Sequence, residues 1–374
     1  MFDLCHVHFA AGKMHARIKS STGNARYQTT VLILGIGHGF SDAAAGYLIG
    51  SLSHDANFIE TGSAVMVYNV IAFGGQLPAG IWLDRIGHYR NPAVLSLLGM
   101  ILALGLLSCH FLWIAIAIAG LSSAIFHVAG GAVTIAGFPE KSRFVGVFSA
   151  FGVLGLALGG WAAMRQWDGA SYLLEAGLAV LLLSLLKANF PLARNRNLPA
   201  PKPQLDNHDY LMILLLMAIA LRSAVWNVIQ LCYAHQYDWL LYVAMAAMAG
   251  KLLGGWLTDH IPWKPYALTA LSIALPALGW GYRKLFWLLL GTGLLQSLTP
   301  MSVIALQRLW PGVPATVSGA AFGLAIAIGG LINFVPFSTP SFQLILFGLL
   351  VGILYYAFLS ADRPLSTRNR KFFR

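Results

Sequence analysis

Charged residues are scarce in this sequence. Asp, Glu, Lys and Arg together fill 10% of the 374 positions, whereas hydrophobic residues fill 58%. Soluble globular domains carry about a quarter of charged residues. A chain of this size could not cover a water-exposed surface with so few polar groups. The composition excludes an ordinary soluble protein and predicts that most of the surface faces a lipid bilayer.

Several motifs of energy conversion and catalysis are also missing. The sequence has no GxxxxGK[ST] nucleotide-binding loop, no HExxH and no GxSxG. Its three cysteines, Cys5, Cys109 and Cys232, do not have metal-binding or redox spacing. A loop resembling an ion-selectivity filter is absent, which disfavours a channel. We therefore expect no enzyme, no metal site and no cofactor, with energy supplied by an ion gradient.

Long apolar runs are what the sequence has in abundance. A membrane-spanning helix needs about 20 mostly apolar residues, and backbone exposed to lipid must satisfy its own hydrogen bonds. We predict an all-α polytopic membrane protein with about 12 transmembrane helices in two six-helix bundles. The predicted spans are 29–52, 61–83, 92–109, 111–137, 144–166, 170–190, 210–234, 238–258, 266–282, 284–306, 316–338 and 340–361.

The chain divides at one long polar stretch, 191–209, which is rich in proline and charge. This stretch is predicted to be a cytoplasmic linker between the bundles 29–190 and 210–361. Residues 1–28 are predicted to form a flexible or surface-lying cytoplasmic tail, and 362–374 a basic cytoplasmic tail.

The net charge of +11 follows a topological pattern. Of the 24 Lys and Arg residues, 19 fall in the two tails and in the loops on the same side. An excess of positive charge marks the cytoplasmic side, so both termini are predicted to be cytoplasmic, in the cell (inner) membrane. The charge is spread over short loops, which argues against a nucleic-acid partner. The expected partners are the bilayer and a small-molecule substrate, and the chain is expected to be a monomer.

An internal repeat relates the two halves. GGQLPAGIWLDRIG (74–87) aligns with AGKLLGGWLTDHIP (249–262) on Asp84 and Asp259. A fainter similarity relates residues 144–160 to 316–331. Two related halves joined by a linker are typical of transporters in which one half rocks against the other.

The first copy of the repeat carries a family resemblance. GIWLDRIGHYRN, which begins at residue 80, resembles the loop between the second and third helices of the major facilitator superfamily. The matching residues are Gly80, Asp84, Arg85, Gly87 and Arg90. The resemblance implies a twelve-helix transporter of two bundles, with this loop as a gate.

The gate assignment has a physical basis. Gly80 permits close packing of two helices, and Asp84 can cap a neighbouring helix or pair with a basic residue. Arg85 and Arg90 can bridge the halves when the cytoplasmic side is closed. Asp259 holds the equivalent position in the second copy. The alternative is an ordinary set of charges in a cytoplasmic loop.

Three further stretches resemble a subgroup of this superfamily, the fosmidomycin resistance proteins. They are 68–87, 120–137 and 221–227. That subgroup has Phe-His-Pro in its fourth helix, where this chain has Phe126 and His127 followed by valine. The resemblance implies export of a small anionic or amphipathic molecule in exchange for protons, and it makes His127 a candidate site residue. The alternative is that His127 only bonds a backbone carbonyl.

Polar groups within the predicted spans are the strongest candidates for function. His38 and Asp42 lie four residues apart, hence on one helix face, in the apolar run 31–52. A charge at the bilayer centre costs at least about 2.5–3.5 kcal/mol, so it usually faces a cavity. We expect Asp42 to titrate and His38 to be its partner or relay. Arg222, at comparable depth in the seventh span, can hold a carboxylate or phosphonate.

By the superfamily resemblance, His38, Asp42 and Arg222 face one space. A fixed His38–Asp42 or Asp42–Arg222 pair that holds helices together is the alternative. Lys251 either reaches toward the cytoplasm or contacts substrate. Trp226 and Asn227 lie one turn after Arg222 and complete the predicted cavity.

The sequence therefore predicts a proton-coupled exporter that works by alternating access. A proton-coupled importer or a lipid transporter of the same fold stays open. A scaffold or sensor without flux is disfavoured, because a fold that does not transport gains nothing from burying charges in the predicted cavity. A membrane-embedded enzyme using His38 and Asp42 is the least favoured alternative, because that pair lacks any accompanying catalytic motif.

Overall fold

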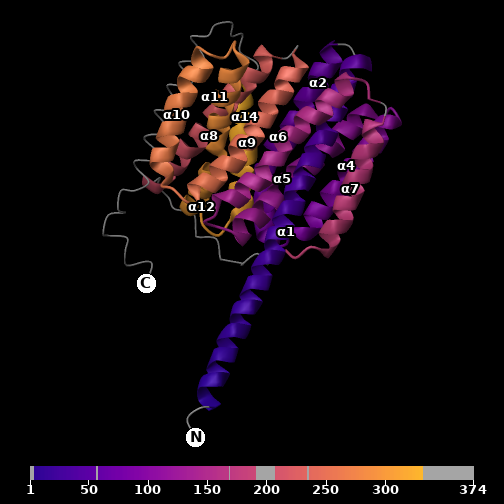
Figure 1. Cartoon of the computed structure of the whole chain (residues 1–374). Helices are drawn as coiled ribbons and strands as arrows, with labels where there is room; N and C mark the ends of the chain where they lie inside the picture. Colours follow the sequence, from indigo (N-terminus) through magenta and orange to yellow (C-terminus); the bar gives the residue numbers. More distant parts are fainter. Residues whose placement is uncertain (1–3, 56–57, 168, 191–206, 234–235, 332–374) are drawn as a thin grey trace.

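The structure is a computed structural model, and it describes residues 4–55, 58–167, 169–190, 207–233 and 236–331. All regular elements of this described part are helices, which confirms the predicted all-α class. Two groups of helices stand side by side (Figure 1), and the chain passes from one to the other after α7. We call α1–α7 the N-terminal half and α8–α14 the C-terminal half.

The N-terminal half contains six spans. Its second span consists of two α-helices joined by a short π-helix, η1. The elements are α1 (Leu4–Asp55), α2 (Phe58–Asn69), η1 (Val70–Gly74), α3 (Gln76–Ile86), α4 (Arg90–Ser108), α5 (Leu112–Gly137), α6 (Ser142–Met164) and α7 (Ala170–Lys187).

The C-terminal half is described as far as its fifth span. The elements are α8 (Asn207–Cys232), α9 (Tyr237–Thr258), α10 (Trp263–Gly279), α11 (Leu285–Ser297), α12 (Thr299–Leu309), α13 (Pro314–Gly319), the π-helix η2 (Ala320–Leu324) and α14 (Ala325–Gly330). The predicted span 340–361 and the tail 362–374 lie outside the described residues, as does most of the linker 191–209.

Nine helices of the described part are long and apolar enough to cross a membrane. Two more predicted spans are shorter: α10 has 17 residues, and the eleventh span is the apolar helix Pro314–Gly330. Large apolar side chains point outward from these helices; on α4, Leu95, Leu98 and Leu102 are all more than half exposed. An outer surface of this kind is what the scarcity of charged residues predicts.

The start of the chain, predicted to be a flexible or surface-lying tail, is helical. Residues 4–28 continue α1 as one helix of 52 residues, and this part projects beyond the bundle (Figure 1). The segment contains no proline, and its Ala, Met, Lys and Arg residues favour helix. Polarity placed the segment outside the membrane, but it did not prevent helix formation.

Three predicted spans are interrupted rather than continuous. The tenth span breaks at Leu298, two residues before Pro300, whose ring removes a backbone donor at the start of α12. The second and eleventh spans each contain a π-helix, η1 and η2, and these lie in contact. Interruptions of this kind are frequent at functional sites.

Helices α1 and α6 form the most extensive helix pair of the described residues. Glycines allow the approach: a Cβ at Gly155 would lie 1.9 Å from the carbonyl oxygen of Gly39. A Cβ at Gly159 would lie 1.8 Å from the oxygen of Ala43. This close seam fixes the position of His38 and Asp42 relative to α6.

Candidate functional site

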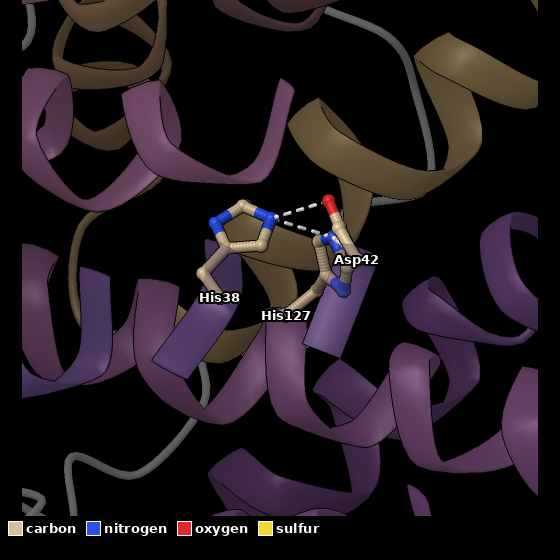
Figure 2. Close-up of side chains that lie close together, drawn as sticks. All are labelled: His38, Asp42 and His127. Atoms are coloured by element: carbon tan, nitrogen blue, oxygen red, sulfur yellow. Dashed lines mark hydrogen bonds and ion pairs between the residues drawn. The ribbon is translucent and has the colours of Figure 1, made fainter. Parts of the chain in front are cut away.

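Three side chains from two helices meet in the interior of the N-terminal half. Figure 2 shows the ring of His38 pointing toward Asp42 and His127. The Nε2 atoms of His38 and His127 lie 2.7 Å apart. The carboxylate oxygens of Asp42 lie 3.2 Å from Nε2 of His38 and 3.4 Å from Nε2 of His127. We call these three residues the His–Asp–His cluster.

Each imidazole of the cluster forms a hydrogen bond to a backbone carbonyl through its Nδ1 atom. Nδ1 of His38 lies 2.8 Å from the oxygen of Phe148 on α6. Nδ1 of His127 lies 2.7 Å from the oxygen of Ser123, one turn earlier on α5. A carbonyl oxygen only accepts, so both Nδ1 atoms carry the proton of the neutral ring. The two Nε2 atoms then present lone pairs toward each other.

The cluster consequently brings acceptor atoms together. Two bare Nε2 atoms and two carboxylate oxygens converge, and acceptors do not stay 2.7 Å apart without a hydrogen between them. One additional proton satisfies the arrangement, because it turns one imidazole into a donor toward the other ring and toward Asp42. The ligand atoms lie within 4.8 Å of one another, so one small cation can contact all three residues.

Burial strengthens the charge interactions of the cluster. His38 and His127 are 5% and 6% exposed, and the side chain of Asp42 is 15% exposed. Coulomb interactions are stronger in such surroundings than in water. The cluster is thus a buried acid–base group that can change its charge by one unit.

Gly152 on α6 forms one wall of the cluster. A Cβ at this position would lie 2.3 Å from Nε2 of His38 and 2.7 Å from Oδ2 of Asp42. We expect Gly152→Ala to displace both side chains and to lower the rate of transport at least about tenfold. A rise of about 1.4 kcal/mol in the activation free energy is enough for a tenfold loss of rate. Gly105→Ala on α4 is the matched control, because a Cβ there meets no atom within 4 Å. Equal transport by both variants at equal membrane levels would contradict this role of Gly152.

Arg222 does not join the cluster directly. It lies on α8 in the other half, is 7% exposed, and places Nη1 3.4 Å from Oε1 of Gln296. Its Nε has no hydrogen-bond partner among the described residues. The side chain forms no ion pair with any carboxylate that the structure describes, so the alternative of a fixed Asp42–Arg222 pair does not occur here.

Lys251 lies between the two groups. It extends from α9 of the C-terminal half and donates from Nζ to the carbonyl oxygen of Ser149 on α6, at 3.0 Å. Asp42, His127 and Arg222 are all within its electrostatic range. Its hydrogen bond thus runs to the other half instead of to the membrane surface.

Trp226 and Asn227, the remaining predicted cavity residues, are half-buried on α8. Asn227 donates from Nδ2 to the carbonyl oxygen of Ser223 at 2.9 Å, and Trp226 packs against the core of the C-terminal half. Their contacts with a substrate stay a prediction.

The predicted gate residue Asp84 caps a helix of the opposite half. Its carboxylate accepts hydrogen bonds from the backbone nitrogens of Ala315 and Thr316, at 3.0 and 2.7 Å, at the start of α13. The hydroxyls of Thr316 and Tyr89 also donate to it. A carboxylate at a helix N-terminus is stabilised by the exposed amides and the helix dipole. Capping, one of the two roles expected for Asp84, is what the structure shows.

Asp259 makes the reciprocal cap. Its Oδ1 accepts from the backbone nitrogen of Ser142, at 2.7 Å, at the start of α6. Arg143 approaches the other carboxylate oxygen at 3.8 Å. The repeated loops therefore cap α13 and α6, the two helices that carry the fainter repeat. We call the two caps together the latch.

Glycines of the repeat make the latch possible. A Cβ at Gly80 would lie 2.4 Å from the oxygen of Ala315, and one at Gly255 would lie 2.9 Å from the oxygen of Ser142. Gly87 ends α3 with a φ of 69°, a conformation that favours glycine. Arg85 and Arg90 are exposed and make no ion pair with described residues. Their bridging role stays a prediction.

Tyr89 supports the cap that Asp84 makes, because its buried hydroxyl donates a hydrogen bond to the Asp84 carboxylate. The residue is 2% exposed and lies in the loop between α3 and α4. Burial raises the pKa of its hydroxyl, and the nearby Asp84 carboxylate adds to the increase. The hydroxyl therefore stays protonated and continues to donate to Asp84 at physiological pH. The sequence motif did not identify Tyr89 as a site residue.

The residues that support the cluster could not be recognised from the sequence. Phe148 and Ser123 contribute backbone carbonyls, which any residue possesses. Gln296, which contacts Arg222 and not the cluster, is one of several polar residues within the spans. Gly152 did lie in the repeated stretch 144–160, and this was the one available signal.

An apolar pocket of about 400 Å³ lies on the other side of the α1–α6 seam. Side chains of α1, α6 and α7 line it, among them Phe40, Phe151 and Leu174. No charged side chain contributes to its wall, so the pocket is separate from the chemistry of the cluster.

Comparison with known proteins agrees with the geometry. Two helical halves that cap each other at one end, around buried titratable groups, define a secondary transporter of the alternating-access kind. The family model of the Major Facilitator Superfamily matches residues 31–335, and the chain belongs to this superfamily. No curated protein matches the sequence.

Solved structures resemble the fold at low sequence identity. The Escherichia coli fucose:proton symporter (N162A) has a TM-score of 0.67 and 13% identity, covering 91% of this chain and 99% of its own. The same symporter in its outward conformation also scores 0.67, with 15% identity and coverages of 90% and 100%. The human organic anion transporter MFSD10 scores 0.62, with 16% identity and coverages of 91% and 99%. These similarities show the fold alone. Membership of the superfamily, which the family model establishes, indicates a transporter and not an enzyme.

Proposed function

We propose that this chain is a proton-coupled secondary transporter of a small molecule and that the His–Asp–His cluster is its proton site. Asp42 is the group whose negative charge retains the proton, and His38 and His127 share it. The transported molecule is small and anionic or amphipathic, as the sequence predicts.

The observation that carries this proposal is the pair of Nε2 atoms 2.7 Å apart beside Asp42. With both Nδ1 atoms donating to carbonyls, the cluster holds one proton more than its neutral tautomers supply. Loss of that proton leaves the carboxylate facing two lone pairs. This repulsion gives the loaded and unloaded states different structures, which is what coupling to a conformational change requires.

The latch supplies the conformational change. With both caps formed, Asp84 and Asp259 close the end at which α3, α6, α9 and α13 meet. By the charge pattern, this end faces the cytoplasm. Opening of the latch would release α13 from α3 and α6 from α9, and each half would move as a body. The solute and the proton would then reach the cytoplasm.

Two directions of transport remain candidates. The resemblance to the fosmidomycin resistance group favours export in exchange for protons. Import together with protons is the second candidate, and one of the structurally similar proteins is a fucose:proton symporter. A lipid substrate and a sensor role without flux are the remaining alternatives from the sequence.

Growth inhibition of an efflux-deficient bacterium tests the function. Cells producing wild type or Asp42→Asn at equal membrane levels are exposed to fosmidomycin, other phosphonates and a range of amphipathic toxins. We expect wild type to change the inhibitory concentration of at least one compound several-fold, upward for an exporter and downward for an importer. Asp42→Asn is expected to match cells without the protein. A shift that is equal with both proteins would remove Asp42 from coupling.

The identity of the coupling cation is tested separately. Transport of the active compound is measured with and without EDTA, and across a pH gradient of either sign. Proton coupling predicts dependence on the pH gradient and no effect of the chelator. Transport that EDTA abolishes, and that the pH gradient leaves unchanged, would assign the cluster to a metal ion instead.

A further inference from the structure

Buried hydrogen-bond donors without acceptors gather between the two halves. Nε of Arg222 and the hydroxyl of Ser149 are both fully buried and have no hydrogen-bond partner among the described residues. Lys251 uses one of its three N–H groups on the oxygen of Ser149. A buried charge is costly unless an opposite charge or several hydrogen bonds compensate it.

The described acidic groups do not provide that compensation. Asp42 is within electrostatic range of Lys251 but pairs with two histidines. Asp84 and Asp259 are used by the latch. Gln296 offers Arg222 a neutral oxygen at 3.4 Å, which is a long contact. Two basic side chains thus share this region with one carboxylate that already pairs with two histidines.

Consecutive residues of α6 connect this region with the proton site. The carbonyl of Phe148 holds Nδ1 of His38, and the carbonyl of Ser149 holds Nζ of Lys251. A shift of this turn of α6 moves both contacts together. The proton site and the two cationic side chains therefore belong to one connected set of contacts.

We propose that an acidic group of the transported molecule binds between Arg222 and Lys251, and that it enters together with the proton of the His–Asp–His cluster. This inference rests on the proposed function and narrows the substrate class to anions. Arg222 provides a planar set of donors that suits a carboxylate or phosphonate, and Lys251 provides a second positive charge. The hydroxyl of Ser149 is a third donor beside Lys251.

The sign of the coupling follows from the charges. A proton on the cluster makes the region more positive and an anion makes it more negative, so each favours the binding of the other. This coupling is reciprocal by thermodynamic necessity. Two ligands that favour each other's binding travel in the same direction, whereas exchange requires that one exclude the other. The inference therefore favours import with protons over the exchange that the family resemblance suggests.

The groups that face the cluster support this sign. Tyr68 on the second span and Lys251 on α9 are within electrostatic range of Asp42. The α6 helix presents Gly152 and Phe148, which carry no charge. The α7 helix carries Glu175, which is half-buried. Uptake of a proton by the cluster therefore adds one positive charge close to the anion site.

Thermal stability of the purified protein in nanodiscs tests the inference without a transport assay. The anionic probes are lactate, citrate, methylphosphonate and fosmidomycin; fucose and glycerol are the neutral probes. A ligand that binds only the folded protein raises its melting temperature. We expect at least one anionic probe to raise it by several degrees at pH 6 and by less at pH 8, while the neutral probes have no effect.

Variants separate the two sites. Arg222→Gln and Lys251→Gln are each expected to weaken the stabilisation by the anion at least about tenfold in apparent affinity. Asp42→Asn is expected to retain anion binding, with a smaller difference in affinity between pH 6 and pH 8 than wild type shows. Arg308→Gln, in the last turn of α12, is the control for a general loss of positive charge and is expected to match wild type, because Arg308 is exposed.

The outcomes distinguish the inference from the proposed function. Stabilisation by no anionic probe, or stabilisation that survives in both Arg222→Gln and Lys251→Gln, overturns the anion site. Stronger anion binding at pH 8 than at pH 6 overturns joint entry and restores exchange. If anions bind as expected while Asp42→Asn transports normally, the anion site stands and the proton site of the proposed function fails.

Discussion

Asp42→Asn is expected to abolish transport against a gradient while leaving the protein folded. The substitution keeps the size of the side chain and removes its charge, so the cluster no longer retains the shared proton of His38 and His127. We expect uphill accumulation in proteoliposomes to fall to the level of empty vesicles. The melting temperature should change by no more than a few degrees, because the shared proton leaves together with the carboxylate charge and no uncompensated buried charge remains.

Glu140→Gln is the matched control for this experiment. Glu140 lies exposed in the loop between α5 and α6, away from the cluster, and the substitution removes the same charge. It is expected to transport as wild type does. If Asp42→Asn still accumulates substrate against its gradient, Asp42 has no part in coupling. The cluster would then be a structural contact between α1 and α5.

Loss of both caps of the latch is expected to shift the protein strongly from the closed toward the open latch, the second-largest effect that we predict. Replacing a capping carboxylate by alanine costs about 0.5–2 kcal/mol. For Asp84→Ala or Asp259→Ala this predicts a roughly 2- to 30-fold shift toward the open latch, since every 1.4 kcal/mol is tenfold. The two caps hold different helices, so the double variant should add the two free energies.

Thiol labelling measures this shift. In a background without Cys5, Cys109 and Cys232, a cysteine replaces the fully buried Ala315 beneath Asp84. We expect a membrane-impermeant maleimide to label it faster in each single variant, and fastest in the double variant. Lys187→Gln is the control, because Lys187 is exposed at the end of α7, away from the latch, and its replacement is expected to leave labelling unchanged. Equal labelling of wild type and the double variant would contradict the assignment of the latch as a gate.

Much of this architecture could be predicted because the bilayer imposes it. Length and apolarity fixed the spans, and the repeat around Asp84 and Asp259 indicated two related halves. The interruptions at η1, η2 and Pro300 were less predictable, because membrane helices tolerate proline and glycine when neighbouring helices satisfy the backbone. The helical conformation of residues 4–28 was not predicted, because polarity indicates a segment outside the membrane and says nothing about its secondary structure.

The site was partly predictable for a similar reason. His38 and Asp42 are four residues apart on one helix, so their contact follows from helix geometry alone. The inclusion of His127 depends on how α5 packs against α1, which a single sequence does not specify. Arg222 was expected to share the space of Asp42, but the structure links the two only through Lys251. The caps that Asp84 and Asp259 make on helices of the opposite half were not predictable either, because they depend on which helix begins beside each carboxylate.

Nitrogen-15 NMR of histidine-labelled protein in lipid tests the central claim most directly. The signals of His38 and His127 are assigned by their loss in His38→Gln and His127→Gln. The account predicts that both rings carry a proton on Nδ1, that one additional proton is shared between their Nε2 atoms, and that Asp42→Asn removes the shared proton. Two neutral rings with independent signals, unchanged in Asp42→Asn, would contradict it.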